Sequence, residues 1–269
     1  MASYLRKRWE PRSEGMSRRD RLGGDYRAYS PDPLVGWELA LPADLAADIA
    51  DAERAVRELD ARGTSHVSLE GLARFLLRAE SVASSRIEGL DAAPRRLARA
   101  EVALAQGSEI DDHVAVEVLG NIRAMESAIE RATEPGVFGL DDILGINRAL
   151  MDRSRPPELG GVVRTEQHWI GGSSYNPCNA AFVPPPPELV SGLLEDLLAY
   201  LACDVHSPLV QAALAHAQFE TIHPFPDGNG RTGRALVHVV LRRRGAARAF
   251  VPPVSLVLAT WATDYIAAL

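Results

Sequence analysis

The stretch His223-Pro-Phe-Pro-Asp-Gly-Asn-Gly-Arg-Thr-Gly-Arg234 decides how the rest of the chain is interpreted. Apolar residues recur at helical spacing before it, from about 207 to 222, and again after it, from 235 to 241. This pattern predicts a helix, a tight loop and a second helix. The stretch holds a histidine, an aspartate, three glycines and two arginines, so it is the first candidate for a chemical site.

The glycines and arginines of this stretch suit the binding of phosphate. Gly228 and Gly230 lack a Cβ, so their backbone can adopt positive φ and turn amide groups inward. Inward amides at a helix start form an anion site, to which the helix dipole adds positive charge. Arg231 and Arg234 are three residues apart on one helical face, where their guanidinium groups can hold phosphate oxygens.

Two other side chains of the stretch suit the chemistry of phosphate transfer. Asp227 offers a hard oxygen ligand for Mg²⁺ bound beside phosphate. His223 is the candidate general base, because the ordinary pKa of histidine lies near neutrality. The alternative is a plain corner between two helices, with capping glycines and solvated arginines. A P-loop is excluded, since that motif requires a lysine and a preceding strand.

The stretch resembles the signature of the Fic family, His-x-Phe-x-Asp/Glu-Gly-Asn-Gly-Arg-x-x-Arg, at every fixed position. The resemblance implies an all-α fold: a helical bundle with a small β-hairpin, the flap, beside the active-site loop. It also implies transfer of AMP from ATP to a Ser, Thr or Tyr hydroxyl of a target protein, with His223 as the base and Asp227 on Mg²⁺. The ATP-binding residues that it implies are Gly228, Asn229, Gly230, Arg231 and Arg234.

A second motif lies upstream, at Ser84-Ser-Arg-Ile-Glu88-Gly89. Ser84 and Glu88 are four residues apart, so they share one face of a helix. A glutamate near a helix C-terminus opposes the dipole, which indicates a cationic partner elsewhere; an ordinary surface glutamate is the alternative. The motif resembles the Ser/Thr-x-x-x-Glu-Gly/Asn element of the Fic subclass with an N-terminal inhibitory helix. The resemblance implies that Glu88 pairs with Arg234 and keeps it from the γ-phosphate of ATP.

Residues 158–187 differ in character from the rest of the chain. Paired glycines and four consecutive prolines exclude a long helix there. Residues 162–170 are the strand candidate and 180–183 their partner, with an irregular loop as the alternative. The resemblance places the flap here, against the side chain of the target. Its candidate target-binding residues are Thr165, Glu166, Gln167, His168 and Ile170.

Composition excludes several other classes of function. The formal net charge of −7 argues against a general nucleic-acid binder. Cys178 and Cys203 match no metal-ligand spacing and are compatible with a reducing compartment. We expect no membrane span and no secretory signal, and therefore a cytoplasmic protein.

Three parts are expected along the chain. Residues 1–30 are rich in Arg, Ser and Gly and predict a flexible basic tail. Residues 31–110 are expected to form an N-terminal helical segment with the inhibitory helix, and residues 111–269 the Fic catalytic domain. Tyr265 is a candidate to close the adenine pocket.

Several functions stay open at this stage. Removal of AMP from a modified target, or transfer of another phosphate-containing group, would use the same site residues. A nucleotide-sensing regulatory module would use the same anion loop without turnover. The sequence also leaves open the identity of the target, self-modification and the formation of a homodimer.

Overall fold

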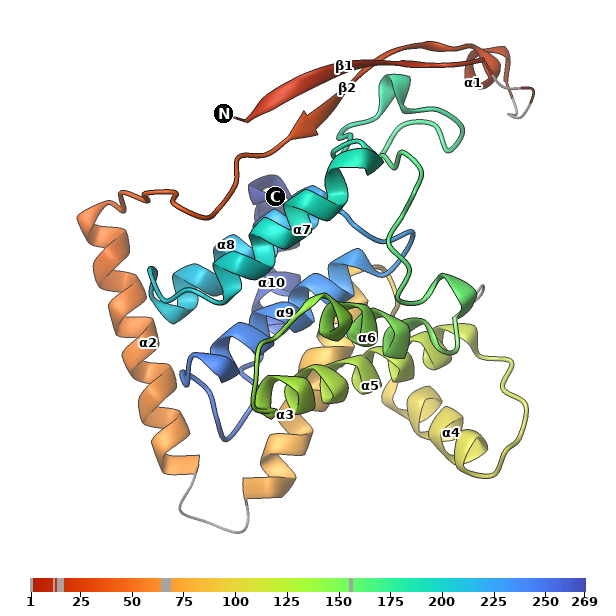
Figure 1. The fold of residues 1–269 in the computed structure, drawn as a ribbon. Coiled ribbons are helices and arrows are strands. Elements are labelled where there is room, and N and C mark those ends of the chain that lie inside the picture. Colours follow the sequence, from red (N-terminus) through yellow and green to blue (C-terminus); the bar gives the residue numbers. More distant parts are fainter. Residues whose placement is uncertain (1, 12, 14–16, 64–68, 155–156) are drawn as a thin grey trace.

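Helices make up most of the structure, a computed structural model that describes residues 2–11, 13, 17–63, 69–154 and 157–269 (Figure 1). The longer helices are α2 (Ala43–Gly63), α3 (Leu69–Ile87), α4 (Pro94–Ala105), α5 (His113–Thr133), α6 (Leu140–Met151), α7 (Pro187–Leu201), α8 (Pro208–Ile222) and α9 (Asn229–Arg243). The short elements are β1 (Ser3–Trp9), α1 (Arg18–Arg21), β2 (Gly24–Ser30), η1 (Pro157–Leu159), η2 (Pro177–Asn179), α10 (Val254–Thr260) and α11 (Ala262–Ala268). The expected all-α bundle is confirmed.

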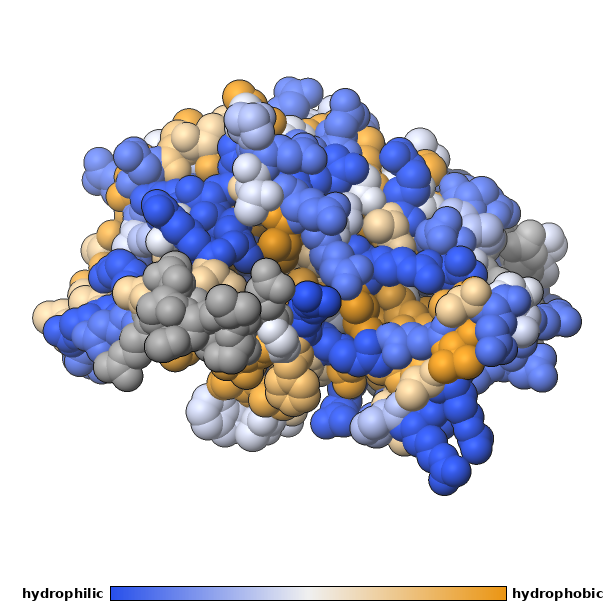
Figure 2. Space-filling view, turned by 90° about the horizontal axis from the view of Figure 1, so that it is seen from below, coloured by the Kyte–Doolittle hydropathy of each residue, from blue (hydrophilic) through white to orange (hydrophobic). Residues whose placement is uncertain are grey.

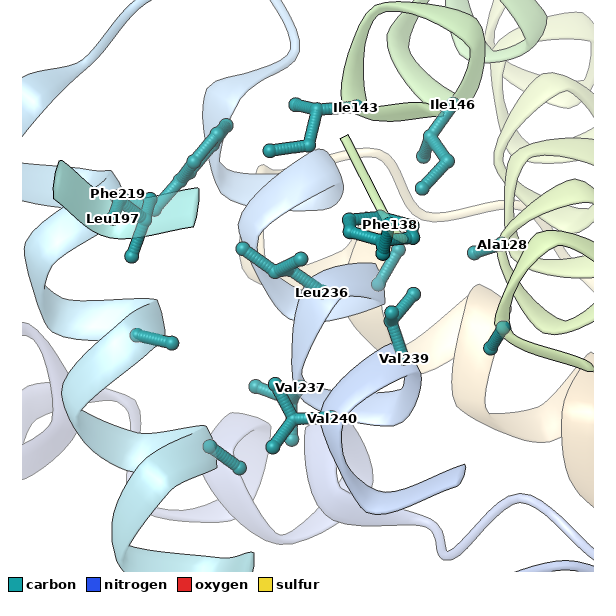
Figure 3. Close-up of a cluster of buried hydrophobic side chains, with 14 of the residues drawn as sticks. Ala128, Phe138, Ile143, Ile146, Leu197, Phe219, Leu236, Val237, Val239 and Val240 are labelled. Atoms are coloured by element: carbon teal, nitrogen blue, oxygen red, sulfur yellow. The ribbon is translucent and has the colours of Figure 1, made fainter. Parts of the chain in front are cut away.

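The main hydrophobic core surrounds α9. Nearly every residue of this helix is buried, because α5, α6 and α8 pack against different sides of it. Figure 3 shows side chains of α9 between those of α7 and α8 on one side and those of α5 and α6 on the other. The labelled members of this cluster are Ala128, Phe138, Ile143, Ile146, Leu197, Phe219, Leu236, Val237, Val239 and Val240. The residues that follow the loop are thus rigidly placed.

A buried polar cluster fixes α3 against α9 and α10. Glu80 of α3 is fully buried and accepts three hydrogen bonds. One joins it to His238 Nε2 of α9 at 2.8 Å, and two come from the backbone N–H (2.8 Å) and the hydroxyl (2.5 Å) of Ser255. On α5, Asn121 Nδ2 donates to Ser81 O at 2.8 Å. Because buried polar groups are costly without partners, these bonds set the rotation of α3 about its axis.

The expected flexible tail is wrong for the residues that form β1 and β2. These strands pair antiparallel, with Tyr4 opposite Tyr29 and Trp9 opposite Gly24. Exposed and half-buried side chains alternate along β1, as they do in a strand with one face packed on the protein. The basic composition concealed this alternation. The expected boundaries at residues 30 and 110 stay predictions.

The expected strand at residues 162–170 is also wrong. The structure has there an extended, irregular segment with a single β-bridge, between Ile170 and Phe182. Its backbone groups find other partners, such as Pro224 O, which accepts from Arg164 N at 2.9 Å. We call residues 162–183 the flap segment.

The lower face of the molecule shows hydrophilic residues over most of its area, with hydrophobic residues in patches between them (Figure 2). In the described part of the chain, no helix combines the length and the apolar composition needed to cross a membrane.

Replacement of Phe225 by alanine is expected to lower the free energy of unfolding by about 3–5 kcal/mol, because its side chain is fully buried and packs on Phe219. Urea denaturation followed by circular dichroism measures this change. Val137→Ala is the control, since Val137 is 86% exposed, and it is expected to change stability by less than about 0.5 kcal/mol. A loss below about 1 kcal/mol for Phe225→Ala would show that the loop is not anchored in the core.

Candidate active site

The loop between α8 and α9 begins and ends with left-handed residues. His223 is the C-cap of α8, and its φ of 50° is the only positive value at a non-glycine residue within the described ranges. Its backbone N–H still donates to Phe219 O at 2.9 Å, which closes the helix. Gly228, with a φ of 78°, forms the N-cap of α9. These two left-handed residues allow the chain to reverse direction between α8 and α9 within a short loop.

Asn229 holds the loop in shape. Its Oδ1 accepts from Phe225 N and its Nδ2 donates to Phe225 O, both at 2.8 Å. Asn147 of α6 supports the loop from below, because its Nδ2 donates to Asp227 O at 3.1 Å and to Thr232 Oγ1 at 3.2 Å. The side chain of Asn229 is therefore engaged by protein, and we assign it to loop shape. Sequence reasoning missed Asn147, which no motif marks.

Arg234 lies buried beneath the C-terminal end of α3. Its side chain is 3% exposed, and its Nη2 donates to Glu88 Oε1 at 2.7 Å and to Ser84 O at 2.9 Å. Its Nε donates to Ser84 Oγ at 2.9 Å. Burial is the largest single effect and by itself would lower the pKa of the guanidinium, but the effects of Glu88 and Tyr265 together outweigh it and raise the pKa. The structure thus joins the two motifs that the sequence separates by 146 positions.

The carboxylate of Glu88 lies over the first turn of α9. A Cβ added at Gly230 would collide with Glu88 Oε1 and come within 3.0 Å of Arg234 Nη1. The carboxylate fills the space that a side chain at position 230 would need, so such a side chain would displace it. Exposed amides at a helix N-terminus attract anions. Glu88 therefore occupies a position at the start of α9 that suits a phosphate group.

The imidazole of His223 is held neutral. Burial is the largest cause, and the positive charges of His168 and Arg164 add to it; together they lower the pKa of His223 to about 4. Within the described residues no hydrogen bond engages the ring. A neutral, unengaged imidazole near the N-terminus of α9 is able to accept a proton from a substrate.

Arg164 fixes the flap segment to the end of α8. Its guanidinium donates to four carbonyl oxygens: Glu166 O (3.0 Å), Pro185 O (2.7 Å), Ile222 O (3.1 Å) and His223 O (2.7 Å). The side chain is almost fully buried, and this burial lowers its pKa to about 10. Sequence reasoning missed this residue, because a single arginine in an irregular segment carries no pattern.

The flap segment brings one of its five expected residues next to the base. The ring of His168 lies 6.4 Å from that of His223. Gln167 Nε2 instead donates to Pro184 O at 2.9 Å, which braces the segment from within. Thr165, Glu166 and Ile170 are exposed at its surface.

Asp227 and Arg231 lie close to one another, and Arg231 also faces Glu117 of α5. The side chain of Asp227 is 59% exposed, and its Oδ1 accepts from Gly228 N at 2.6 Å. Arg231 is buried, 3.9 Å from Asp227 Oδ1 and 3.4 Å from Glu117 Oε2. No cluster of three acidic, histidine or cysteine side chains suited to a metal occurs in the part of the chain that is described. One exposed carboxylate fits Mg²⁺ that takes its other ligands from nucleotide phosphates and water.

A second buried cluster lies behind Arg234. The hydroxyl of Tyr265 lies 2.7 Å from His216 Nε2, and the two rings stack with centroids 5.9 Å apart. The positive charge of Arg234 lies near Tyr265, but burial outweighs it and raises the pKa of the Tyr265 hydroxyl. Burial raises the pKa of Glu220 to about 7 and lowers that of His216 to about 4. Cys178 and Cys203 are both free thiols.

The protonation state of His223 can be tested directly. We expect NMR of the imidazole nitrogens to show a neutral ring down to about pH 4, because burial and two nearby cations disfavour the imidazolium. His223→Ala identifies the signal. Titration with a midpoint near the ordinary histidine value of about 6.5 would contradict this environment.

Two family profiles match the chain: the Fic/DOC family over residues 137–241 and the Fic/DOC family N-terminal region over residues 46–130. The chain is 35% identical to protein adenylyltransferase fic-1 of Caenorhabditis elegans over 131 residues, which are 48% of this chain and 23% of that protein. It is 29% identical to protein adenylyltransferase Fic of Drosophila grimshawi over 246 residues, 89% of this chain and 45% of that protein. The chain thus spans less than half the length of these curated relatives.

Solved structures agree with this assignment. A Fic family protein from Desulfovibrio desulfuricans G20 superposes with a TM-score of 0.61 at 26% identity, covering 85% of this chain and 66% of that one. Fic-1 of C. elegans shares the fold, with a TM-score of 0.61 at 24% identity over 84% of this chain and 66% of that one. With the loop, the arginine pair and the upstream helix arranged as described, the chain belongs to the Fic/DOC family.

Proposed function

We propose that this chain transfers AMP from ATP to a hydroxyl of a target protein, and that Glu88 restrains the reaction. The observation that carries the proposal is the contact between Glu88 and Arg234 over the first turn of α9. This contact brings together the start of α9, which suits phosphate, the buried cation Arg234 and the anion Glu88, which a substitution can remove. All three lie near the neutral ring of His223. The names of the curated relatives, protein adenylyltransferases, support the same reaction.

The reaction follows from these groups. His223 accepts the proton of a Ser, Thr or Tyr hydroxyl, and the oxygen forms a bond to the α-phosphorus of ATP. The bond from that phosphorus to the bridging oxygen breaks, and pyrophosphate leaves with the electron pair. The amide of Gly230 at the start of α9 stabilises negative charge on the phosphates, whereas that of Gly228 donates to Asp227 Oδ1. Arg231 and Arg234 hold the outer phosphates.

Asp227 would hold Mg²⁺ together with the phosphates, and the ion would neutralise charge on the leaving group. The exposure of its carboxylate leaves room for such an ion. We further propose that the reaction takes place in the cytoplasm, in keeping with the free thiols at Cys178 and Cys203.

Restraint follows from competition for one guanidinium. While Glu88 accepts from Arg234 Nη2, that cation is unavailable to the γ-phosphate, and the carboxylate repels the phosphates from the helix start. The pair is only partly buried, because the Glu88 side chain is 39% exposed. A small movement of the Glu88 side chain is therefore sufficient to break the ion pair and release Arg234.

Replacement of Glu88 by glycine is expected to raise AMP transfer at least tenfold, because each loss of about 1.4 kcal/mol in the restraint corresponds to a factor of ten. Transfer of label from α-³²P-ATP to the enzyme itself and to lysate proteins measures it, and γ-³²P-ATP in parallel tests for transfer of phosphate. Glu109→Gly, at an exposed glutamate remote from the site, is the matched control. Glu88→Gly combined with His223→Ala is expected to transfer nothing.

Other outcomes would favour the alternatives. Equal labelling by the wild type and Glu88→Gly would show that Glu88 does not restrain the transfer of AMP. Faster loss of AMP from a pre-modified target with the wild type than with Glu88→Gly would indicate removal of AMP, with Glu88 orienting water. Calorimetric binding of ATP without transfer by Glu88→Gly would indicate a nucleotide-sensing module.

A further inference from the structure

Two strands and one short helix form a basic arm at the N-terminus. We define the arm as β1, α1 and β2, and Figure 1 shows it lying across the flap segment and the start of α7. The rings of Trp9 and Trp169 meet edge to face, with centroids 5.4 Å apart. The backbone N–H of Tyr29 donates to Val183 O at 2.8 Å. The arm is therefore built against the flap segment.

Charged contacts complete the attachment. Lys7 Nζ lies 2.5 Å from Glu188 Oε1 at the first turn of α7. Ser173 Oγ donates to Asp20 Oδ1 at 2.6 Å, which ties the flap segment to α1. An arm held by aromatic, backbone and polar contacts has a defined position relative to the site.

Two adjacent residues of the flap segment, His168 and Trp169, lie between the proposed base and the arm. Trp169 contacts Trp9 of the arm, and its neighbour His168 lies beside the ring of His223. A protein whose hydroxyl reaches His223 must lay its neighbouring residues along the flap segment. The arm is the next surface that those residues meet.

The outward face of the arm is positive. Arg6 and Arg27 lie directly opposite one another in the two strands, and Arg8 is paired with Asp25 in the register. Like charges opposite each other destabilise a sheet. Within the part that is described, Asp25 is the acid that offsets them, through its ion pair with Arg6. An acidic partner would relieve the remaining repulsion.

The charge of the arm is opposite to that of the whole molecule. Residues 1–30 contain eight Lys or Arg and four Asp or Glu, although the chain carries a net charge of −7. Arg8, Arg18 and Arg21 are exposed and form no ion pair with any described residue. A local field of this kind attracts acidic partners and orients them.

A groove lies between the arm and the flap segment. Its volume is about 350 Å³, and Tyr4 and Arg27 line one wall, with Phe182 and Val183 on the other. The guanidinium of Arg27 lies 4.8 Å from the centre of the Tyr4 ring. The groove can take a side chain of an extended segment whose carboxylates pair with the arginines.

We propose that the N-terminal arm is a docking surface for the target protein, and that it takes an acidic, extended segment next to the hydroxyl that is modified. The inference rests on the proposed function and adds a substrate class to it. A protein segment fits better than nucleic acid, because the arginines share their surface with Asp25 and the rest of the chain is acidic.

Fluorescence anisotropy with labelled peptides tests this docking without ATP. One peptide carries a central threonine followed by a run of glutamates, and its match carries glutamines instead. We expect the wild type to bind the acidic peptide at least about tenfold more tightly, with weaker binding at high salt. The triple variant Arg6→Glu, Arg8→Glu and Arg27→Glu is expected to lose this preference.

The matched control reverses arginines away from the arm. Arg54→Glu, Arg95→Glu and Arg99→Glu change the net charge equally on α2 and α4, and this variant is expected to keep the preference. The milder variant Arg6→Gln, Arg8→Gln and Arg27→Gln is expected to give an intermediate affinity, and equal melting temperatures show that the arm is still folded.

Three results would overturn the docking surface: equal binding of the two peptides, equal losses in the arm and control variants, or tighter binding of a single-stranded oligonucleotide than of the acidic peptide. Transfer of AMP to the acidic peptide by Glu88→Gly is measured separately. Selective binding without any transfer would uphold the docking surface and reject the proposed function.

Discussion

The ion pair between Arg234 and Glu88 is the interaction on which the rest of the site depends. A buried guanidinium requires partners for its donors, and α3 supplies them as a carboxylate, a hydroxyl and a carbonyl oxygen. The pair brings an acid from the first third of the chain to a helix start that otherwise attracts anions. Under the proposed function, restraint and the binding of ATP therefore compete for the same charge.

The surrounding structure fixes the position of this ion pair. Glu80 and Asn121 fix the rotation of α3, so Glu88, the residue that follows this helix, faces α9. Arg164 ties the flap segment to the end of α8, which places His168 beside His223. The arm then extends the flap segment outward as a positive surface. The flap segment is thus positioned by its contacts with the loop, and the arm by its contacts with the flap segment.

The sequence predicted the loop, the all-α bundle and the contact of Glu88 with Arg234, because their residues form compact motifs. It did not predict Arg164 or Asn147, whose roles depend on carbonyl groups that only the folded chain brings together. The arm was missed because arginines and serines outweighed the alternation in β1. The strand at 162–170 was wrongly expected, since local pattern does not show that Arg164 N donates to Pro224 O. The hydroxyl of Tyr265 contacts His216, and its expected place at the adenine stays a prediction.

A double-mutant cycle on the free energy of unfolding tests the central pair most directly. It compares Glu88→Gln, Arg234→Gln and their combination with the wild type by urea denaturation. The account predicts a coupling energy of at least about 1 kcal/mol, because the two groups share a partly buried ion pair. Effects that add within about 0.3 kcal/mol would show that Glu88 and Arg234 do not hold each other, and would contradict the account.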